Sequence, residues 1–358
     1  MLLMKPSPTY DIARSYEANY QEGPFLKEKP PARRIQKKVK FLGFDVNSRL
    51  GIPAGPLLNS RWIIAYGELG FDLLVYKTVR TSATPSHPDP NCMFLQVKGP
   101  LTEKDFGTRL VATMESPSRV EEISITNSFG MPSRDPKIWQ EDIGRAKAGI
   151  GDGQLLIVSV VGTPGEKDLA EDYARAARLA VEAGAPAVEI NLSCPNVVTG
   201  EGSVYTDPVF SAEISRRVKR AIGAVPLIIK IGYIPDPSRL EKVVAANAPH
   251  VDAISGLNTL SFEVVKPDGT QALPGKGRLR SGVCGAAIRP CAMTQGARIV
   301  ELKRKAKYDF EVVGVGGVMT AAHIREFFDL GVDAVMTATG AMWDPFLAYN
   351  YWKEEAGG

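Results

Sequence analysis

The sequence lacks the residues that would build a metal centre, a membrane span or a histidine-centred active site. Its four cysteines show no C-x-x-C spacing, so no local motif exists for a zinc ribbon or an iron–sulfur cluster. Its three histidines fall outside any cluster of polar loop residues. No apolar stretch approaches the ~20 residues that cross a bilayer, and Pro6 and Pro8 interrupt the start before a signal peptide could form. We therefore expect a cytoplasmic protein with no metal and no membrane contact.

What is present is the composition of a folded protein. The chain has 358 residues, of which 44% are hydrophobic and 23% charged, which is enough apolar material for a large core. This length allows two ordinary domains or one large barrel. The net charge of +3 is local, because residues 1–40 hold nine Lys or Arg against four acids, while the rest hold 34 against 36. We expect residues 1–41 to form a polar, basic extension, a solvated arm packed on the surface, and we expect no nucleic-acid partner.

From residue 42 onward, short apolar runs alternate with segments of helical period. We predict strands at 51–55, 72–77, 155–161, 187–191, 227–231, 253–255, 311–315 and 334–337. We predict helices at 60–69, 167–183, 208–222, 237–246, 290–306, 321–330 and 344–355. Eight such units predict an α/β fold, a (β/α)8 TIM barrel over residues 42–358, with a doubly wound sheet as the alternative. Residues 81–133 break the alternation and predict an insertion, with a hairpin and loops, over the C-terminal mouth of the barrel.

Polar side chains gather where the predicted strands end, which is where barrel enzymes hold their reactive groups. Four carboxamides occupy such positions: Asn127, Asn191, Asn196 and Asn258. A single buried Asn in a loop is routine, but together they suit a flat, neutral, amide-rich ring such as a pyrimidine. Lys77 and Lys230 end or interrupt apolar strands, where a buried ammonium requires an anion, a polar ligand or an ion pair at the barrel rim.

Two glycine-rich turns, at 314–317 and 337–340, follow the last two predicted strands. Barrels commonly bind phosphate at this place, so we predict a phosphate-bearing cofactor. Cys194 lies between Ser193 and Pro195 at a predicted strand-to-loop turn. A buried, inert cysteine is the ordinary alternative. Because no histidine accompanies it, we predict that Cys194 acts as a base rather than as a nucleophile.

An ordered set of motifs resembles the dihydroorotate dehydrogenase family of FMN barrels over residues 42–352. The set comprises NSFGMP at 127–132, EINLSCPNV at 189–197, IK at 229–230, GLNT at 256–259, AIRP at 287–290 and GVGGV at 314–318. The order of the whole set is specific, whereas one short piece would not be.

The resemblance implies oxidation of (S)-dihydroorotate to orotate in de novo pyrimidine biosynthesis. In this family a loop base removes a proton from carbon 5 while a hydride leaves carbon 6 for the flavin, and Cys194 stands at the position of that base. A cysteine there is similar to the soluble fumarate-linked and NAD-linked classes, whereas the quinone-linked membrane class has serine. Fumarate is the expected acceptor, since no dinucleotide-binding fingerprint is present and NAD would require a partner electron-transfer subunit. We expect a homodimer.

The resemblance also assigns roles to individual residues. It implies that the substrate contacts are Lys77, Asn127, Phe129, Gly130, Met131, Asn191, Asn196, Asn258 and Thr259. It implies that the flavin contacts are Ala54, Gly55, Lys77, Thr78, Asn191, Lys230, Gly285, Gly316, Gly317, Ala338 and Thr339.

Two alternatives stay open. The run LPGKG at 273–277 is similar to dihydropyrimidine dehydrogenases, which reduce uracil or thymine and would here require a partner subunit that carries iron–sulfur clusters. The second alternative is a flavin-binding barrel without turnover, against which the Cys194 motif and the amide set argue. Pro56 and the long N-terminal extension depart from the compact fumarate-linked enzymes.

Overall fold

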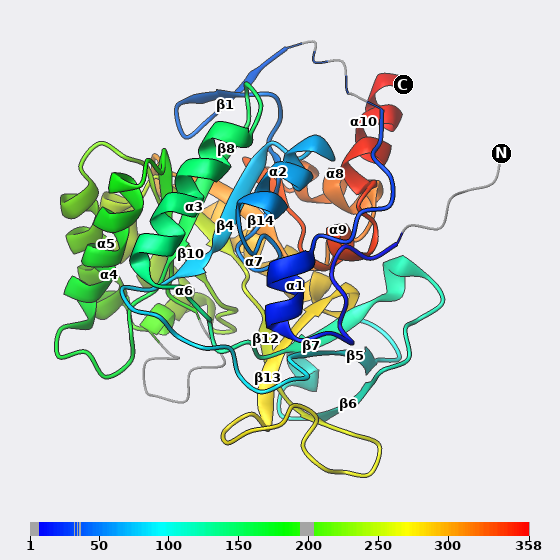
Figure 1. Cartoon of the computed structure of the whole chain (residues 1–358). Coiled ribbons are helices and arrows are strands. Elements are labelled where there is room, and N and C mark those ends of the chain that lie inside the picture. Colours follow the sequence, from blue (N-terminus) through cyan, green and yellow to red (C-terminus); the bar gives the residue numbers. More distant parts are fainter. Residues whose placement is uncertain (1–6, 32, 34, 36, 194–203, 358) are drawn as a thin grey trace.

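A closed barrel of eight parallel strands forms the centre of the molecule (Figure 1). The computed structural model describes residues 7–31, 33, 35, 37–193 and 204–357. The barrel strands are β3 (Leu50–Ile52), β4 (Leu73–Val79), β8 (Leu155–Val160), β9 (Ala187–Asn191), β10 (Leu227–Ile231), β11 (Ala253–Gly256), β14 (Glu311–Val315) and β15 (Ala334–Met336). Each coincides with a predicted strand. The predicted TIM barrel is confirmed, and the doubly wound alternative is wrong because the sheet closes on itself.

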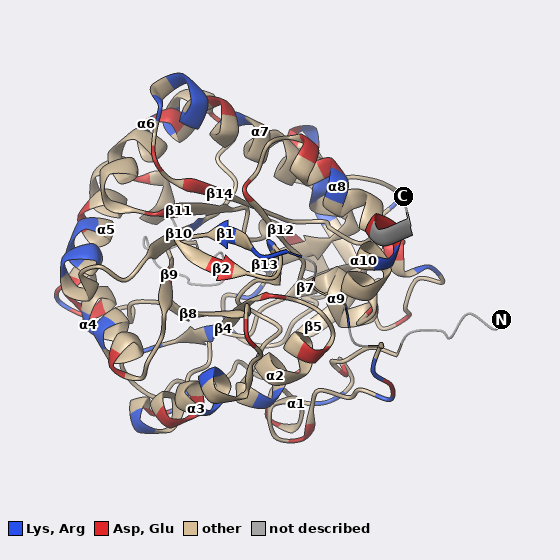
Figure 2. Cartoon of the chain, turned by 90° about the horizontal axis from the view of Figure 1, so that it is seen from above, with Lys and Arg blue, Asp and Glu red and all other residues tan. Residues whose placement is uncertain are grey.

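Helices form a ring around the barrel, with their charged residues on the outer faces (Figure 2). They are α2 (Ser60–Glu68), α3 (Pro136–Gly149), α4 (Leu169–Glu182), α5 (Pro208–Ile222), α6 (Pro237–Asn247), α7 (Arg289–Ala306), α8 (Ala321–Asp329), α9 (Thr339–Trp343) and α10 (Leu347–Gly357), with 3-10 turns at Glu103–Asp105, Val120–Glu122, Ala248–His250 and Ala286–Ile288. Helix α3 was not predicted, although Asp135 caps it and Pro136 begins it, which is a typical start signal.

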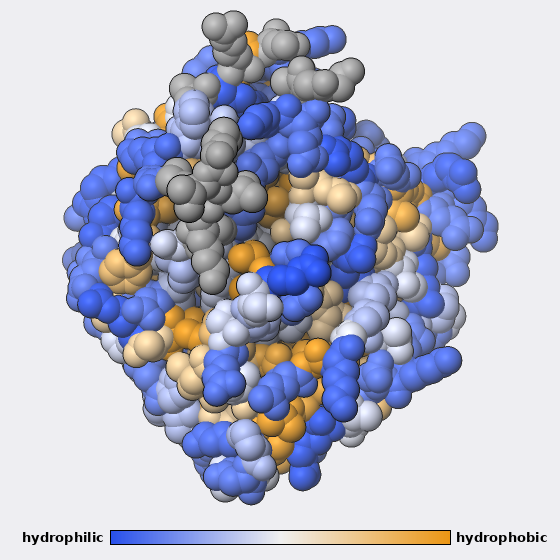
Figure 3. Space-filling model, turned by 90° about the vertical axis from the view of Figure 1, so that its right-hand side faces the viewer, coloured by the Kyte–Doolittle hydropathy of each residue, from blue (hydrophilic) through white to orange (hydrophobic). Residues whose placement is uncertain are grey.

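A second, five-stranded sheet lies beside the barrel, in the lower part of Figure 1. Its strands are β5 (Cys92–Gln96), β6 (Arg109–Thr113), β7 (Ser124–Asn127), β12 (Leu260–Val265) and β13 (Arg280–Gly285), and they close in the order β12-β13-β7-β5-β6. The predicted insertion therefore supplies three strands rather than one hairpin, and two further strands come from the segment after β11. Figure 3 shows a largely hydrophilic surface with apolar residues gathered in its lower part.

The barrel interior changes from apolar to polar along its axis. The hairpin of β1 (Val39–Phe41) and β2 (Phe44–Val46) closes the end at which the strands begin, and Val75, Ile157 and Ile228 pack above it. Because side chains alternate along a strand, the next inward positions follow two residues later. On β8, β9, β10 and β11 these positions are Ser159, Glu189, Lys230 and Ser255. Polar side chains thus lie beneath the mouth.

The N-terminal arm, residues 7–25, packs against the mouth of the barrel and contains helix α1 (Tyr16–Glu22). Thr9 and Asn19 are 0% exposed. The Thr9 amide donates to the Met342 carbonyl oxygen at 2.8 Å, and the Thr9 hydroxyl bonds to the Tyr66 hydroxyl at 2.6 Å. The arm packs on the surface, as predicted, but it is not solvated throughout, because Thr9 and Asn19 are buried and form hydrogen bonds within the protein.

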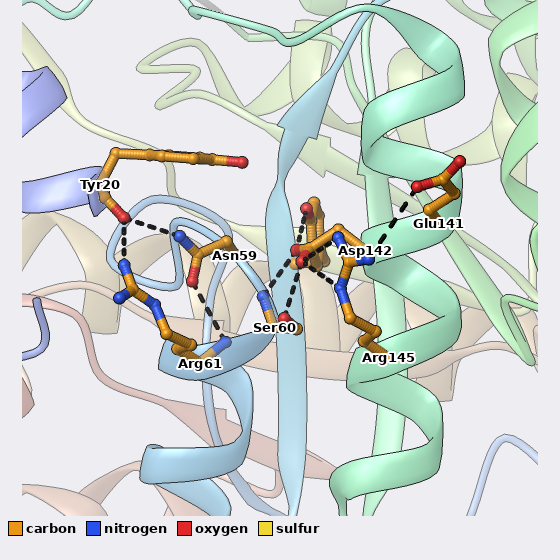
Figure 4. A network of polar contacts seen from close by, with 8 residues as sticks. Tyr20, Asn59, Ser60, Arg61, Glu141, Asp142 and Arg145 are labelled. Carbon is orange, nitrogen blue, oxygen red and sulfur yellow. Dashed lines mark hydrogen bonds and ion pairs between the residues drawn. The ribbon is translucent and has the colours of Figure 1, made fainter. Parts of the chain in front are cut away.

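A network of polar contacts joins α1 to the barrel (Figure 4). The Tyr20 carbonyl oxygen accepts hydrogen bonds from the Asn59 amide and the Arg61 guanidinium at the start of α2. In α3, the Asp142 carboxylate accepts from the Ser60 amide and hydroxyl and from the Tyr76 hydroxyl of β4, each at 2.7 Å. The network fixes the arm, α2, α3 and the end of β4 relative to one another.

Candidate functional site

A cavity lies between the barrel mouth, the second sheet and the arm. Lys77 and Lys230 project into it, and its described lining residues include no Asp or Glu. The described lining of the cavity therefore combines two lysines with no carboxylate, which favours a ligand that bears carboxylate or phosphate groups.

The floor of the cavity is formed by the ends of barrel strands. The register of β4 against β8 shifts between Tyr76 and Val79, and this irregularity lets both Lys77 and Thr78 line the cavity. The Thr78 hydroxyl bonds to the Ser159 hydroxyl at 3.0 Å. Lys230 is 2% exposed, and burial lowers the pKa of its ammonium, although the Glu189 carboxylate acts in the opposite direction.

Three of the four predicted carboxamides line one side of the cavity. The Asn258 amide donates to the Asn191 side-chain oxygen at 3.3 Å, so β9 and the turn after β11 are in contact there. The Asn127 amide donates to Cys284 Sγ at 3.3 Å, and the Asn191 amide donates to Met131 Sδ at 3.7 Å. Sulfur is a weak acceptor, so these amides remain available to donate to a polar ring.

The loop after β7 closes the cavity on the side of the second sheet. Phe129 and Met131 line the cavity, whereas Gly130 does not. Gly130 has a φ of +78°, and a Cβ there would lie 2.5 Å from the His87 ring. The Arg278 guanidinium donates to the Ser128 carbonyl oxygen at 2.6 Å, and His87 Nδ1 lies 3.2 Å from the Ser128 hydroxyl. Arg278 and His87, which were not predicted as site residues, therefore stabilise the conformation of this loop.

A glycine cradle, formed by Gly316, Gly317, Ala338 and Thr339, closes the other end of the cavity. Gly316 and Gly317 have φ values of +125° and +71°, and a Cβ on Gly317 would lie 2.5 Å from the Arg289 Cβ. The hydroxyl oxygens of Thr339 and Thr259 are buried and have no hydrogen-bond partner in the described part of the chain. Close backbone and unpartnered hydroxyls fit the phosphate and ribityl groups of a flavin nucleotide.

The structure brings most of the predicted site residues together. Those that line this single cavity are Ala54, Gly55, Lys77, Thr78, Asn127, Phe129, Met131, Asn191, Lys230, Asn258, Thr259, Gly285, Gly316, Gly317, Ala338 and Thr339. Cys194 and Asn196 fall outside the described residues. The role of each residue stays a prediction.

Several lining residues were not predicted. Tyr10 and Tyr16 of the arm reach the cavity and contact Phe129, with ring centroids 6.1 and 5.9 Å apart, and no local pattern in the polar arm indicated this. Cys92 and Cys284 also line it, although the sequence gave them no distinctive surroundings. Burial raises the pKa of Cys284 to about 11 and also raises the pKa of Cys92 well above its usual value, so both are thiols at neutral pH.

A parallel barrel whose mouth combines lysines, carboxamides and a glycine cradle is the architecture of a flavin-dependent oxidoreductase. The family model of dihydroorotate dehydrogenase matches residues 36–354. The chain belongs to the dihydroorotate dehydrogenase family.

Two relatives are similar to the chain in sequence, and one solved structure is similar to it in fold. It is 39% identical to the dihydroorotate dehydrogenase of Dictyostelium discoideum over 96% of both chains. It is 28% identical to the catalytic subunit of dihydroorotate dehydrogenase B (NAD(+)) of Desulforudis audaxviator, over 81% of this chain and 84% of the relative. The fold is similar to that of Eimeria tenella DHODH, crystallised in complex with ferulenol, with a TM-score of 0.71 at 14% identity over 92% of this chain and 85% of that one. None of the helices in the described ranges combines the length and apolarity needed to cross a membrane.

Proposed function

We propose that the chain oxidises (S)-dihydroorotate to orotate with FMN as cofactor, in pyrimidine biosynthesis, and that residues 42–358 form the FMN-binding unit. One observation carries the proposal: the carboxamides of Asn127, Asn191 and Asn258 line the same cavity as Lys77 and the glycine cradle, and no described lining residue of that cavity is a carboxylate. Carboxamides match the ring amides of a pyrimidine, and the cations match its carboxylate.

The residues of the chain then divide between two ligands. Gly316, Gly317, Ala338 and Thr339 would hold the FMN phosphate, while Lys230 and Thr78 would face the ring. Bound FMN supplies the hydride acceptor of the reaction. Tyr10, Tyr16 and Phe129 cover the opposite side, so the arm would exclude water from the reacting carbons.

Cys194 would remove the proton from carbon 5. Ser193, the last described residue after β9, lines the cavity. The other thiols of the cavity are poor candidates, since burial raises their pKa values and a base must be deprotonated to act.

We propose fumarate as the electron acceptor. A dicarboxylate suits a cavity that contains two lysines and no described carboxylate. The Desulforudis relative is named as the catalytic subunit of an NAD(+)-linked enzyme, so the competing proposal is transfer to NAD through a partner subunit.

We also propose a homodimer in the cytoplasm. Met114 and Leu279, at the ends of strands in the second sheet, are 49% and 39% exposed, and the apolar residues of Figure 3 gather in this part of the molecule. Sedimentation of the purified protein at several concentrations would decide the oligomeric state.

Anaerobic titration of the FMN-loaded protein tests substrate and acceptor separately. Dihydroorotate should bleach the flavin absorbance, dihydrouracil should not, and fumarate should restore it. Bleaching by dihydrouracil alone would favour the dihydropyrimidine dehydrogenase alternative. Failure of fumarate to reoxidise the flavin would leave the NAD-linked route, and a protein that binds no FMN would contradict the proposal.

Cys194→Ser should bind FMN normally but slow its reduction by dihydroorotate ~100-fold or more at neutral pH, since a hydroxyl is a far weaker base than a thiolate. Stopped-flow absorbance measures this rate. Cys291→Ser is the matched control, because Cys291 is buried against the Leu101 carbonyl oxygen, outside the cavity lining. An equal rate in Cys194→Ser and in the unmodified protein would remove Cys194 from this role.

A further inference from the structure

Glu189, at the centre of β9, is a buried carboxylate that the proposed reaction does not use. It is 1% exposed. Neither of its oxygens has a hydrogen-bond partner of normal geometry within the described ranges. Burying such a group is costly unless a cation or a set of donors compensates it. Its position inside the barrel therefore requires an explanation.

The compensating cation is Lys230. Glu189 pairs in register with Ser159 on β8 and with Ile228 on β10, and Lys230 is the next inward residue of β10. Burial raises the pKa of Glu189, whereas Lys230 acts to lower it. The effect is mutual, since Glu189 acts to raise the pKa of Lys230. Each charge is thus within electrostatic reach of the other, although Lys230 lines the cavity and Glu189 lies one layer below it.

The same layer contains hydroxyl groups that lead toward the cavity floor. The Ser159 hydroxyl lies beside Glu189 and acts to lower its pKa, and it bonds at 3.0 Å to the Thr78 hydroxyl, which lines the cavity. Ser255 pairs in register with Lys230, and its buried hydroxyl has no described partner. A polar layer therefore lies directly beneath the site to which the proposed function assigns the flavin.

We propose that Glu189 is a positioning residue for flavin chemistry, which holds the Lys230 ammonium at the cavity floor and supplies the negative charge that sets the reduction potential of the bound flavin. This inference rests on the proposed function, because it requires a flavin above Lys230.

The sign of the effect follows from the charges. A flavin that accepts a hydride gains negative charge, which the Lys230 ammonium stabilises. The Glu189 carboxylate opposes that stabilisation, so its removal should make reduction easier. Among the described residues, Lys77 on β4 is the other titratable group that faces this layer, since β3, β8, β11, β14 and β15 contribute only glycine, hydroxyl or apolar side chains to it. Glu311 of β14 lies at the opposite end of the barrel, beside Leu42.

The test is a redox titration of FMN-loaded protein without substrate, in which a dye reports the ambient potential. In Glu189→Gln the ratio of reduced to oxidised flavin at a fixed ambient potential should rise at least tenfold, which corresponds to about 30 mV for a two-electron couple. Glu311→Gln is the matched control, in which the ratio of reduced to oxidised flavin should stay within twofold of that in the unmodified protein. Glu311 is a partly buried carboxylate at the opposite end of the barrel, where it accepts a hydrogen bond from the Leu42 amide.

A second pair of variants tests whether Glu189 acts through Lys230. In a Lys230→Met protein, the further change Glu189→Gln should leave the potential unchanged, because a buried carboxyl group without a neighbouring cation takes up a proton and its replacement then removes no charge. An equal shift in the presence and absence of Lys230 would overturn the proposal.

The remaining outcomes are also decisive. A Glu189→Gln potential equal to or lower than that of the unmodified protein would overturn the inference. If Glu189→Gln does not fold, Glu189→Asp is the deciding variant, since it keeps the charge but moves it away by one methylene. A rise of less than tenfold in the ratio of reduced to oxidised flavin supports the inference, and an unchanged potential refutes it. If the protein binds no FMN, the proposed function is refuted instead. If dihydroorotate reduces the bound flavin but the reduction potential is the same with and without Glu189, this inference alone is refuted.

Discussion

Replacement of Asp142 by alanine should destabilise the fold more than most single substitutions, because this side chain joins three elements. Asp142 is 6% exposed and accepts hydrogen bonds from the Ser60 amide, the Ser60 hydroxyl and the Tyr76 hydroxyl. In Asp142→Ala all three donors lose their acceptor inside the protein. A buried donor left unsatisfied costs about 1–3 kcal/mol, so we expect a loss of about 4 kcal/mol in the free energy of unfolding.

This free energy converts into a shift of the unfolding midpoint. Unfolding entropy near the midpoint is about 2.1 cal/mol/K per residue, which for 358 residues amounts to about 0.75 kcal/mol/K. The midpoint of Asp142→Ala should therefore fall by about 5 °C. Tyr76→Phe removes one donor and leaves the carboxylate its other partners, so it should lower the midpoint by only about 1 °C.

Differential scanning calorimetry of the two variants and the unmodified protein measures both shifts. Asp142→Asn is the intermediate case, since it keeps one acceptor oxygen and should fall between the two. A midpoint for Asp142→Ala within about 1 °C of the parent value would refute the argument, because it would mean that water replaces the carboxylate without cost. Equal losses in Asp142→Ala and Tyr76→Phe would show that the Tyr76 contact alone accounts for the effect.

Two further predictions concern the walls of the cavity. Gly317→Ala should weaken FMN binding at least ~tenfold, since its φ is +71° and the new Cβ would lie 2.5 Å from the Arg289 Cβ; flavin fluorescence measures the affinity, and Gly269→Ala, with a φ of +83° but open space, is the control. His87→Gln should make stability less sensitive to acid. Burial and Arg278 lower the pKa of His87, so the unfolded chain binds the proton more readily and the stabilisation by the neutral ring is lost as the pH falls below 6.5. Urea unfolding midpoints of His87→Gln and the unmodified protein, measured at pH ~7.5 and ~5.5, check this prediction. An equal fall of the midpoint in both proteins would contradict it.

The sequence predicted the barrel because a short apolar run marks each of its strands locally. The runs 155–161 and 227–231 are apolar on both faces, as expected for parallel strands covered by helices, and they coincide with β8 and β10. The site followed from the same signal, since residues that end parallel strands converge on one edge. Asn191, Lys230 and Gly316 are distant in sequence but line one cavity. Their chemical roles, with that of Cys194, stay predictions.

The features that the sequence did not reveal depend on contacts between distant segments. Tyr10 and Tyr16 stand in a polar arm whose composition indicates a solvated surface, and only their packing on Phe129 places them at the cavity. Cys284 has no local motif, and its position follows from the pairing of β13 with β7. Strands β12 and β13 complete a sheet whose other strands, β5, β6 and β7, come from a segment far earlier in the chain. No periodicity in the sequence encodes such a pairing.

The hydrogen bond between Thr9 and Met342 has a consequence for synthesis of the protein on the ribosome. The arm precedes all the barrel strands in the chain, whereas the carbonyl oxygen that it binds follows them all. The cavity therefore cannot close until the segment that contains Met342 has been made, whereas β3 and β4 become available earlier. Because β15, which closes the barrel, directly precedes the segment of Met342, closure of the barrel and covering of its mouth by the arm depend on the same late part of the chain.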